Sequence, residues 1–167
     1  EFKCCKCDED HPSCICFHHV DPQNKLKSIC QLVNEAASKE KIVEEIGKCA
    51  VMCHNCHVKL HFEKDSRIDK EPRSNVHKRR IDCSKWFLYY IIEKMLKCVE
   101  CEKDDPVILC FHHLNSSEKA FNVSHMVSFA YSKKRIINEV AKCNVMCQNC
   151  HSKHHWSHDY RRSNVKV

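Results

Sequence analysis

The sequence predicts a small α+β fold built from two tandem metal-stapled modules, joined by a basic linker and a helix. Three observations favour this prediction. The 167 residues include sixteen cysteines and fourteen histidines, far more metal ligands than an average protein carries. The first part of the chain repeats in the last part, and each copy contains two Cys-x-x-Cys pairs. A module of this size buries little apolar surface, so a metal ion is an expected part of its fold.

The repeat has a fixed offset of 94 residues, which places Cys4 on Cys98. Cys16-Phe17-His18-His19 then falls on Cys110-Phe111-His112-His113, and Asn55-Cys56-His57 falls on Asn149-Cys150-His151, without a gap. Roughly 25 of about 58 aligned positions are identical, which indicates a duplication.

The duplication divides the chain into two modules with a connection between them. The region from Arg67 to Arg80 is polar and basic and contains Pro72, whereas residues 81–97 lack Gly and Pro and carry apolar residues near helical spacing. The predicted parts are a first module (1–66), a basic linker (67–80), a connecting helix (81–97), a second module (98–160) and a basic tail (161–167).

Within each module the expected order is knuckle, strand, helix, knuckle, helix, where each knuckle is a turn formed by a Cys-x-x-Cys pair. The strand covers 13–19 or 107–113 and ends in the His pair. Ser38 or Ser132 caps the following helix, which runs to Lys48 or Lys142. The last helix is indicated by His57 and His61, and by His151 and His155, because residues four apart share one helical face.

The cysteines indicate metal ligands rather than disulfides. The start, Glu1-Phe2-Lys3-Cys4, lacks the apolar core of a signal peptide, and 30% of the residues are charged. We therefore expect an intracellular, reducing location, in the cytoplasm or the nucleus. Frequent lysine and isoleucine with a single glycine are compatible with an AT-rich viral genome, so the cell could be a virus-infected host.

Four thiolates in each module form a predicted structural zinc site, giving two zinc ions per chain. Two Cys-x-x-Cys pairs can close a tetrahedron around zinc and leave no open position. The long intervening loop does not exclude the site, because loop-closure entropy rises only logarithmically with length. The predicted ligands are Cys4, Cys7, Cys53 and Cys56 in the first module and Cys98, Cys101, Cys147 and Cys150 in the second. The single repeated cysteines, Cys16, Cys49, Cys110 and Cys143, are interpreted as core residues.

Four further histidines repeat in each module and favour a second kind of metal site. Three imidazoles can hold a divalent ion and leave positions open for water and substrate, as a catalytic ion requires. Successive strand residues point to opposite faces, so one member of each His-His pair should bind the ion while its neighbour is free to act as a general base. The alternative is that these histidines support the zinc site or lie exposed on a strand.

These motifs resemble the HNH endonucleases of the His-Me finger (ββα-metal) superfamily, and most closely a zinc-stapled subgroup with a Phe-His-His strand followed by Lys-Cys-x-Val-x-Cys-x-Asn-Cys-His. The resemblance covers 4–61 and 98–155 and implies two tandem ββα-metal modules. It implies that His18, His57 and His61 bind one catalytic ion and that His112, His151 and His155 bind the other. The ion would be Mg²⁺, Mn²⁺, Zn²⁺ or Ni²⁺, with His19 and His113 as the general bases.

One position departs from the family pattern. The Asn that orients the base should lie nine residues before the first ligand of the last helix, where this chain has Lys48 and Lys142. Asn55 and Asn149 lie inside the zinc knuckle. The residue that orients the base is therefore not assigned from the sequence.

The expected function is metal-dependent hydrolysis of phosphodiesters in nucleic acid, with double-stranded DNA as the partner. The net charge of +6 suits a polyanion, and two active sites could act within a monomer. The longest apolar run, near Trp86 to Ile92, is too short for a membrane span. Two alternatives remain, a non-catalytic zinc-dependent DNA- or RNA-binding protein, such as a transcription or recombination factor, and a zinc-stabilised interaction scaffold.

Overall fold

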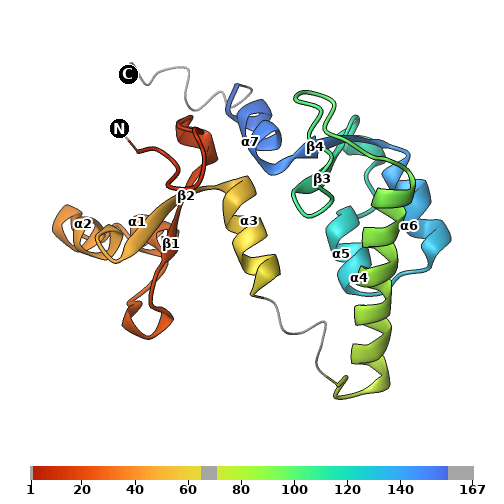
Figure 1. The fold of residues 1–167 in the computed structure, drawn as a ribbon, viewed down its shortest axis with the longest axis horizontal. Helices are drawn as coiled ribbons and strands as arrows, with labels where there is room; N and C mark the ends of the chain where they lie inside the picture. The colour runs from red at the N-terminus through yellow and green to blue at the C-terminus, as the bar shows by residue number, and fades with distance from the viewer. Residues whose placement is uncertain (1, 65–70, 158–167) are drawn as a thin grey trace. The chain divides into compact units, whose positions relative to one another are not determined.

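The computed structural model describes residues 2–64 and 71–157 (Figure 1). It is a small α+β structure, with two two-stranded antiparallel sheets and seven α-helices among the described residues. The Cα positions divide the chain into two compact units, Glu1–His57 and Val58–Val167, and the division falls inside helix α3 (His54–Glu63). Part of the predicted linker and the predicted basic tail lie outside the described residues.

In the first module, strand β1 (Ile15–His19) pairs with β2 (Cys49–Cys53). The register sets Ile15 opposite Cys53 and His19 opposite Cys49. The helices α1 (Ile29–Asn34) and α2 (Lys39–Ile46) lie between the two strands in sequence, and α3 follows β2 directly. Short 3-10 helices at Pro12–Cys14 and Pro22–Asn24 flank β1.

Serine caps position the two helices between the strands. The Ser28 side chain accepts a hydrogen bond from the Gln31 N–H, and Gln31 Oε1 accepts one from the Ser28 N–H, which forms a capping box. The Ser38 hydroxyl accepts from the Lys41 N–H at the start of α2. Between the helices, Ala36 has a φ of 51°, which turns the chain. The predicted caps Ser38 and Ser132 are confirmed.

The second module repeats the strands, the α-helices and the second 3-10 helix at the same offset of 94 residues. Strand β3 (Leu109–His113) pairs with β4 (Cys143–Cys147), with Leu109 opposite Cys147. The remaining elements are α5 (Val123–Ser128), α6 (Lys133–Val140), α7 (Gln148–Ser157) and a 3-10 helix at Ser116–Glu118. Ala130, the counterpart of Ala36, also has a positive φ, at 52°.

Helix α4 (Asn75–Glu93) packs against α5 and completes the core of the second unit (Figure 1). Phe87 and Ile91 belong to the same buried cluster as Ile108, Met126 and Ile136. The helix faces this core with side chains one turn apart, as an amphipathic helix does.

The connecting helix differs from its predicted range of 81–97. The Ser74 side chain caps it by accepting from the His77 N–H, so it begins at Asn75 and takes in residues assigned to the linker. It ends at Glu93 because Met95 has a φ of 49°, which a continuing helix cannot adopt. The basic run before Ile81 is therefore helical.

Two predictions about the modules were incomplete. Strands β2 and β4 cover Cys49–Cys53 and Cys143–Cys147, between the predicted helix end and the last Cys-x-x-Cys pair, where no strand was predicted. The six-residue helices α1 and α5 were not expected at all. Among the described residues, no helix is both long enough and apolar enough to cross a membrane.

Candidate metal centres

The eight predicted thiolate ligands form two clusters, one in each module. In each cluster, the four sulfur atoms lie within 4.8 Å of one another. The first pair of cysteines precedes the sheet, and the second pair spans the junction between the second strand and the last helix. The clusters are Cys4, Cys7, Cys53 and Cys56, and Cys98, Cys101, Cys147 and Cys150.

The sulfur separations fit zinc. The Cys7 Sγ lies 3.7 Å from the Sγ atoms of Cys53 and Cys56, and Cys101 Sγ lies 3.7 Å from Cys147 Sγ. A tetrahedron with Zn–S bonds of about 2.3 Å has edges of about 3.8 Å, whereas a disulfide requires about 2.05 Å. All sixteen cysteines are free of disulfides. The two clusters could therefore bind two structural zinc ions.

Backbone amides stabilise thiolates in these clusters. The Lys6 N–H donates to Cys4 Sγ at 3.4 Å, and the Cys56 N–H donates to Cys53 Sγ at 3.4 Å. Burial alone would raise the pKa of Cys4, but backbone hydrogen bonds from Cys53, Lys6 and Cys7 outweigh it and lower that pKa to about 7. The same balance lowers the pKa of Cys98 to about 7. One thiol in each cluster is thus prepared for deprotonation by a metal ion.

The single repeated cysteines are thiol donors rather than ligands. Cys16 Sγ donates to the Met52 carbonyl at 3.2 Å, and Cys110 Sγ donates to Met146 at the same distance. Burial raises the pKa of Cys16 to about 11 and that of Cys110 to about 12. These half-buried residues brace the two strands against each other.

The six predicted histidine ligands also form one group in each module. Within each group, one ring nitrogen from each histidine lies within 4.8 Å of those of the other two. The His57 Nε2 lies 3.1 Å from His18 Nδ1, and His155 Nε2 lies 3.1 Å from His151 Nε2. Ligand edges of about 3.0 to 3.4 Å follow from metal–nitrogen bonds of about 2.1 Å in octahedral or tetrahedral geometry. The groups are His18, His57 and His61, and His112, His151 and His155.

The structure explains how each group forms. In the first module, β1 supplies His18, while the continuous helix α3 supplies His57 and His61 one turn apart. In the second module, burial and the neighbouring rings of His155, His112 and His154 lower the pKa of His151 to about 4. A neutral imidazole is the form that binds a metal ion.

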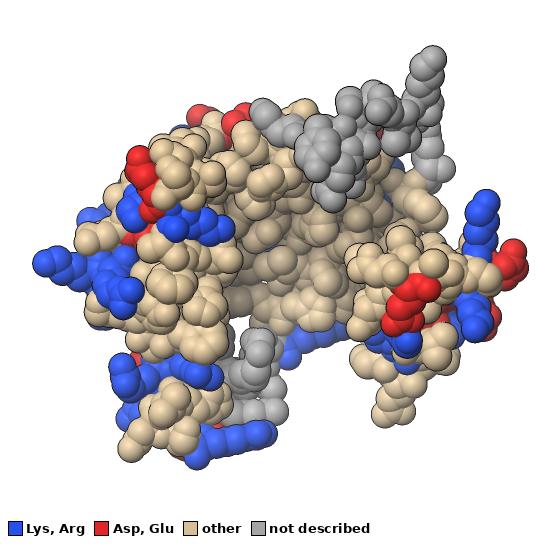
Figure 2. Space-filling view, turned by 180° about the vertical axis from the view of Figure 1, so that it is seen from behind, with Lys and Arg blue, Asp and Glu red and all other residues tan. Residues whose placement is uncertain are grey.

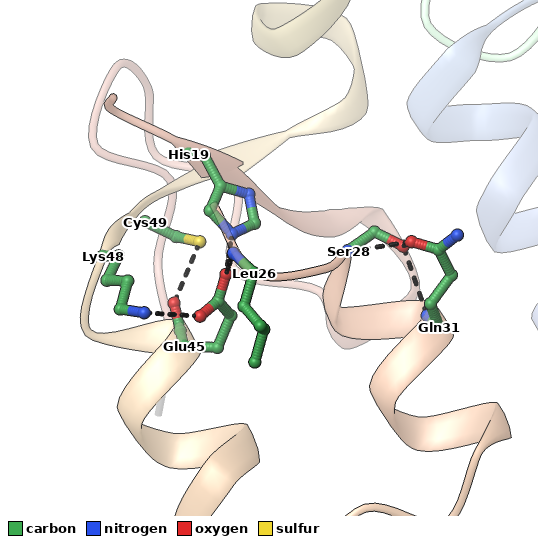
Figure 3. Close-up of polar contacts among 7 residues, drawn as sticks. All are labelled: His19, Leu26, Ser28, Gln31, Glu45, Lys48 and Cys49. Carbon is green, nitrogen blue, oxygen red and sulfur yellow. Dashed lines mark hydrogen bonds and ion pairs between the residues drawn. The ribbon is translucent and has the colours of Figure 1, made fainter. Parts of the chain in front are cut away.

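His19 is turned toward helix α2 and contacts a buried carboxylate (Figure 3). Its Nε2 lies 2.8 Å from Glu45 Oε1, and the two side chains are 8% and 1% exposed. The same carboxylate accepts from the Leu26 N–H at 2.8 Å and from Lys48 Nζ at 2.8 Å. The hydrogen bond from Lys48, with those from Leu26 and His19, lowers the pKa of Glu45 to about 2.

The second module contains the same network. His113 Nε2 lies 2.8 Å from Glu139 Oε1, and Lys142 Nζ lies 2.8 Å from Glu139 Oε2. Burial would raise the pKa of Glu139, but donors led by Lys142 and His113 lower it to about 2. In both modules, the histidine predicted to be the base thus contacts an ionised carboxylate.

The role of these glutamates was not predicted from the sequence. Glu45 and Glu139 are identical at the offset of 94 and lie one turn before Lys48 and Lys142. That repetition was the available signal, but an acidic residue on a short helix is more often solvated than buried. His154 was not predicted either: its ring lies 4.5 Å from that of His112, and Leu60 stands at its position in the first module.

The chain matches no protein-family model, no curated protein and no solved structure at a significant level. Its function is therefore argued from the site alone.

Proposed function

We propose that each module is a one-ion phosphodiesterase of the HNH type in the His-Me finger superfamily, acting on double-stranded DNA. One observation carries the proposal. Three imidazoles converge in each module, and the residue beside the first of them is a second histidine tied to a buried carboxylate. A purely structural zinc module requires neither feature.

The imidazole group supplies an open divalent site. His18, His57 and His61 would hold the ion in the first module, and His112, His151 and His155 would hold it in the second. When bound, such an ion polarises a phosphodiester and neutralises charge on the departing oxygen. The order β1, β2, α3 around this site is compatible with a ββα-metal arrangement.

The carboxylate selects the tautomer of the proposed base. Because Glu45 is ionised, it accepts the Nε2 proton of His19, which leaves the lone pair on Nδ1. That Nδ1 has no partner among the described residues. It can accept a proton from water, as a general base does. His113 and Glu139 repeat this arrangement.

Glu45 and Lys48 take over the role that the family assigns to an asparagine. Glu45 orients the imidazole, and Lys48 holds the other oxygen of the same carboxylate. The lysine at the expected Asn position therefore acts on the base through a glutamate. Glu45 and Glu139 are positioning residues rather than catalytic ones.

The charge distribution supports a nucleic-acid substrate. Basic side chains gather on α4 and α6 in the second unit, where acidic ones are fewer (Figure 2). Lys and Arg side chains neutralise phosphates without reading the sequence. Together with the net charge of +6, this favours backbone contacts with a polyanion.

One observation favours the alternative of a non-catalytic DNA- or RNA-binding protein. His19 is only 8% exposed, and Glu45 also binds the Leu26 backbone. The same network would hold α2 against β1 without any chemistry. The two functions differ in whether DNA is cut.

Plasmid nicking tests the proposal. The purified chain is incubated with supercoiled plasmid and Mg²⁺, Mn²⁺, Zn²⁺ or Ni²⁺, beside the double variant His19→Ala, His113→Ala. We expect nicking by the wild type and its loss, by roughly 100-fold or more, in the double variant. His54→Ala is the matched control, because this α3 histidine lies outside the site and its counterpart is Gln148.

The outcomes separate the two functions. Binding of plasmid without nicking in any of these ions favours the non-catalytic alternative. Nicking that survives the double variant refutes His19 and His113 as bases. A metal content near two zinc ions per chain fits the thiolate clusters alone, and a total approaching four indicates that the histidine groups are occupied too.

A further inference from the structure

Helix α4 fills an apolar groove of the second module. The groove lies between α5, α6 and β3, and Val123, Val127 and Ile136 contribute to it. Phe87 and Ile91 of α4 belong to the same buried cluster, and the Phe87 ring lies 5.4 Å from that of Phe111. The helix leaves Val127 only 8% exposed.

The corresponding groove of the first module is open. It has a volume of about 740 Å³ and is lined by Phe17, Ile29, Val33 and Ile42, among others. These residues correspond at the offset of 94 to Phe111, Val123, Val127 and Ile136. Val33 is 56% exposed, against 8% for its counterpart. The duplication has thus preserved an apolar helix-binding surface, which no described helix of the first unit covers.

Charged residues at the rim indicate what the groove would accept. In the second module, Lys133 Nζ lies 5.0 Å from the ring centre of Trp86 on α4. Lys39 occupies the equivalent position in the first module and is exposed. A lysine is therefore again available to cover an aromatic ring on a bound helix.

A second rim position is aromatic in the second module and acidic in the first. The guanidinium of Arg80 on α4 lies 4.9 Å from the Phe129 ring centre. The first module has Glu35 at this position, with a half-exposed side chain paired to Lys27. A bound helix with a basic residue two turns before its aromatic anchor, as Arg80 precedes Phe87 in α4, would therefore place that residue near the Glu35 carboxylate.

We propose that the first-module groove binds an amphipathic helix of a partner protein. The helix presents bulky apolar side chains one turn apart, in the manner of Phe87 and Ile91, and a basic residue two turns earlier. The chain's own α4 is engaged in the second unit, so the ligand is another helix. This helix-in-groove mode depends on apolar anchors at helical spacing and is independent of the proposed nuclease activity.

A peptide with the sequence of residues 75–93 is the probe. It carries a fluorescent label and is titrated into the full chain, with anisotropy and circular dichroism as readouts. We expect saturable one-to-one binding with a gain of helix, because an isolated peptide of this length is only marginally helical. A peptide with Phe87→Ala and Ile91→Ala should not bind.

Two valines provide matched variants of the protein. Val33 lines the groove, whereas Val43 on α2 is 67% exposed and does not. Val33→Asp should weaken peptide binding roughly tenfold or more by placing a charge in an apolar site, while Val43→Asp should leave it unchanged. Unchanged zinc content in both variants shows that the modules remain folded.

Three outcomes would overturn the proposal. One is an absence of peptide binding. Another is binding that Val33→Asp does not weaken, because the peptide would then occupy another surface or displace α4 from the second module. The third is a dimer, seen by sedimentation, that Val33→Asp dissociates, because the groove would then hold a second copy of this chain.

Discussion

The two modules share one framework but bury their apolar surfaces differently. Strand register, the Ser38 cap, thiolate clusters and the His-Glu-Lys network all repeat at the offset of 94. In the second module, α4 closes the apolar face and Ile136 is fully buried. In the first, Val33 remains 56% exposed and Ile42 only partly buried. The thiolate framework is therefore present without a full core in the first module, which should depend more heavily on metal binding.

Removing a zinc ligand should produce the largest difference in stability between the two modules. Cys53→Ser should unfold the first module, because an apparent zinc-binding free energy on the order of 10 kcal/mol is lost where little apolar core exists. Cys147→Ser should leave helical structure around α4, α5 and α6. Hydrogen exchange of the β1–β2 and α4 amides measures both effects.

Cys16→Ser is the control for these ligand substitutions, since Cys16 is a thiol donor outside the cluster. It should retain two zinc ions per chain. Equal loss of protection in the two modules after the ligand substitutions would contradict the unequal dependence on metal.

A charge placed on the apolar face should affect only the covered module. Val127→Asp puts a carboxylate into the buried cluster and should cost on the order of 3 to 5 kcal/mol of unfolding free energy. Val33→Asp, at the equivalent exposed position, should change it by about 0.5 kcal/mol or less. Denaturant titration of both variants measures the difference, and similar values would show that α4 does not stabilise the second module.

Loss of the orienting carboxylate should affect the two modules equally. Glu45→Gln in the His113→Ala background, and Glu139→Gln in the His19→Ala background, should each slow nicking roughly 10- to 100-fold, because the base loses its preferred tautomer. Under saturating DNA the loss should appear in kcat rather than KM, with zinc content unchanged. An effect confined to stability would show that Glu45 has no role in orienting the base.

Lowering the pH should produce the smallest of these effects, a loss of the contribution of Glu139 to the unfolding free energy. The pKa of Glu139 is lowered from 4.5 to about 2, so its stabilising contribution is complete above pH 4.5 and is lost as the pH falls toward 2. The unfolding free energies of wild type and Glu139→Gln should therefore converge over this range. A constant difference, with zinc release followed in both proteins, would contradict the lowered pKa.

The parts predicted from the sequence are those that local chemistry fixes. Cys-x-x-Cys pairs, the spacing of His57 and His61 and the serine caps each have a local signature, and duplication made each signature visible twice. The clustering of the four thiolates in each module followed from the preference of zinc for such pairs.

The parts that were missed depend on tertiary packing. The segment Cys49–Cys53 has no clear alternation, and only its pairing with β1 makes it a strand. The six-residue helix α1 is too short for periodicity to reveal. Glu45 becomes a partner of His19 only when α2 packs against β1, and its burial cannot be read from a polar helix.

The rate of DNA cleavage by the two single-base variants tests the central claim most directly. His19→Ala leaves the second site intact and His113→Ala leaves the first, so each should nick a labelled duplex, while the double variant should be inactive. Cleavage by the double variant at the wild-type rate would contradict the claim that the paired histidines are the catalytic bases of the two modules.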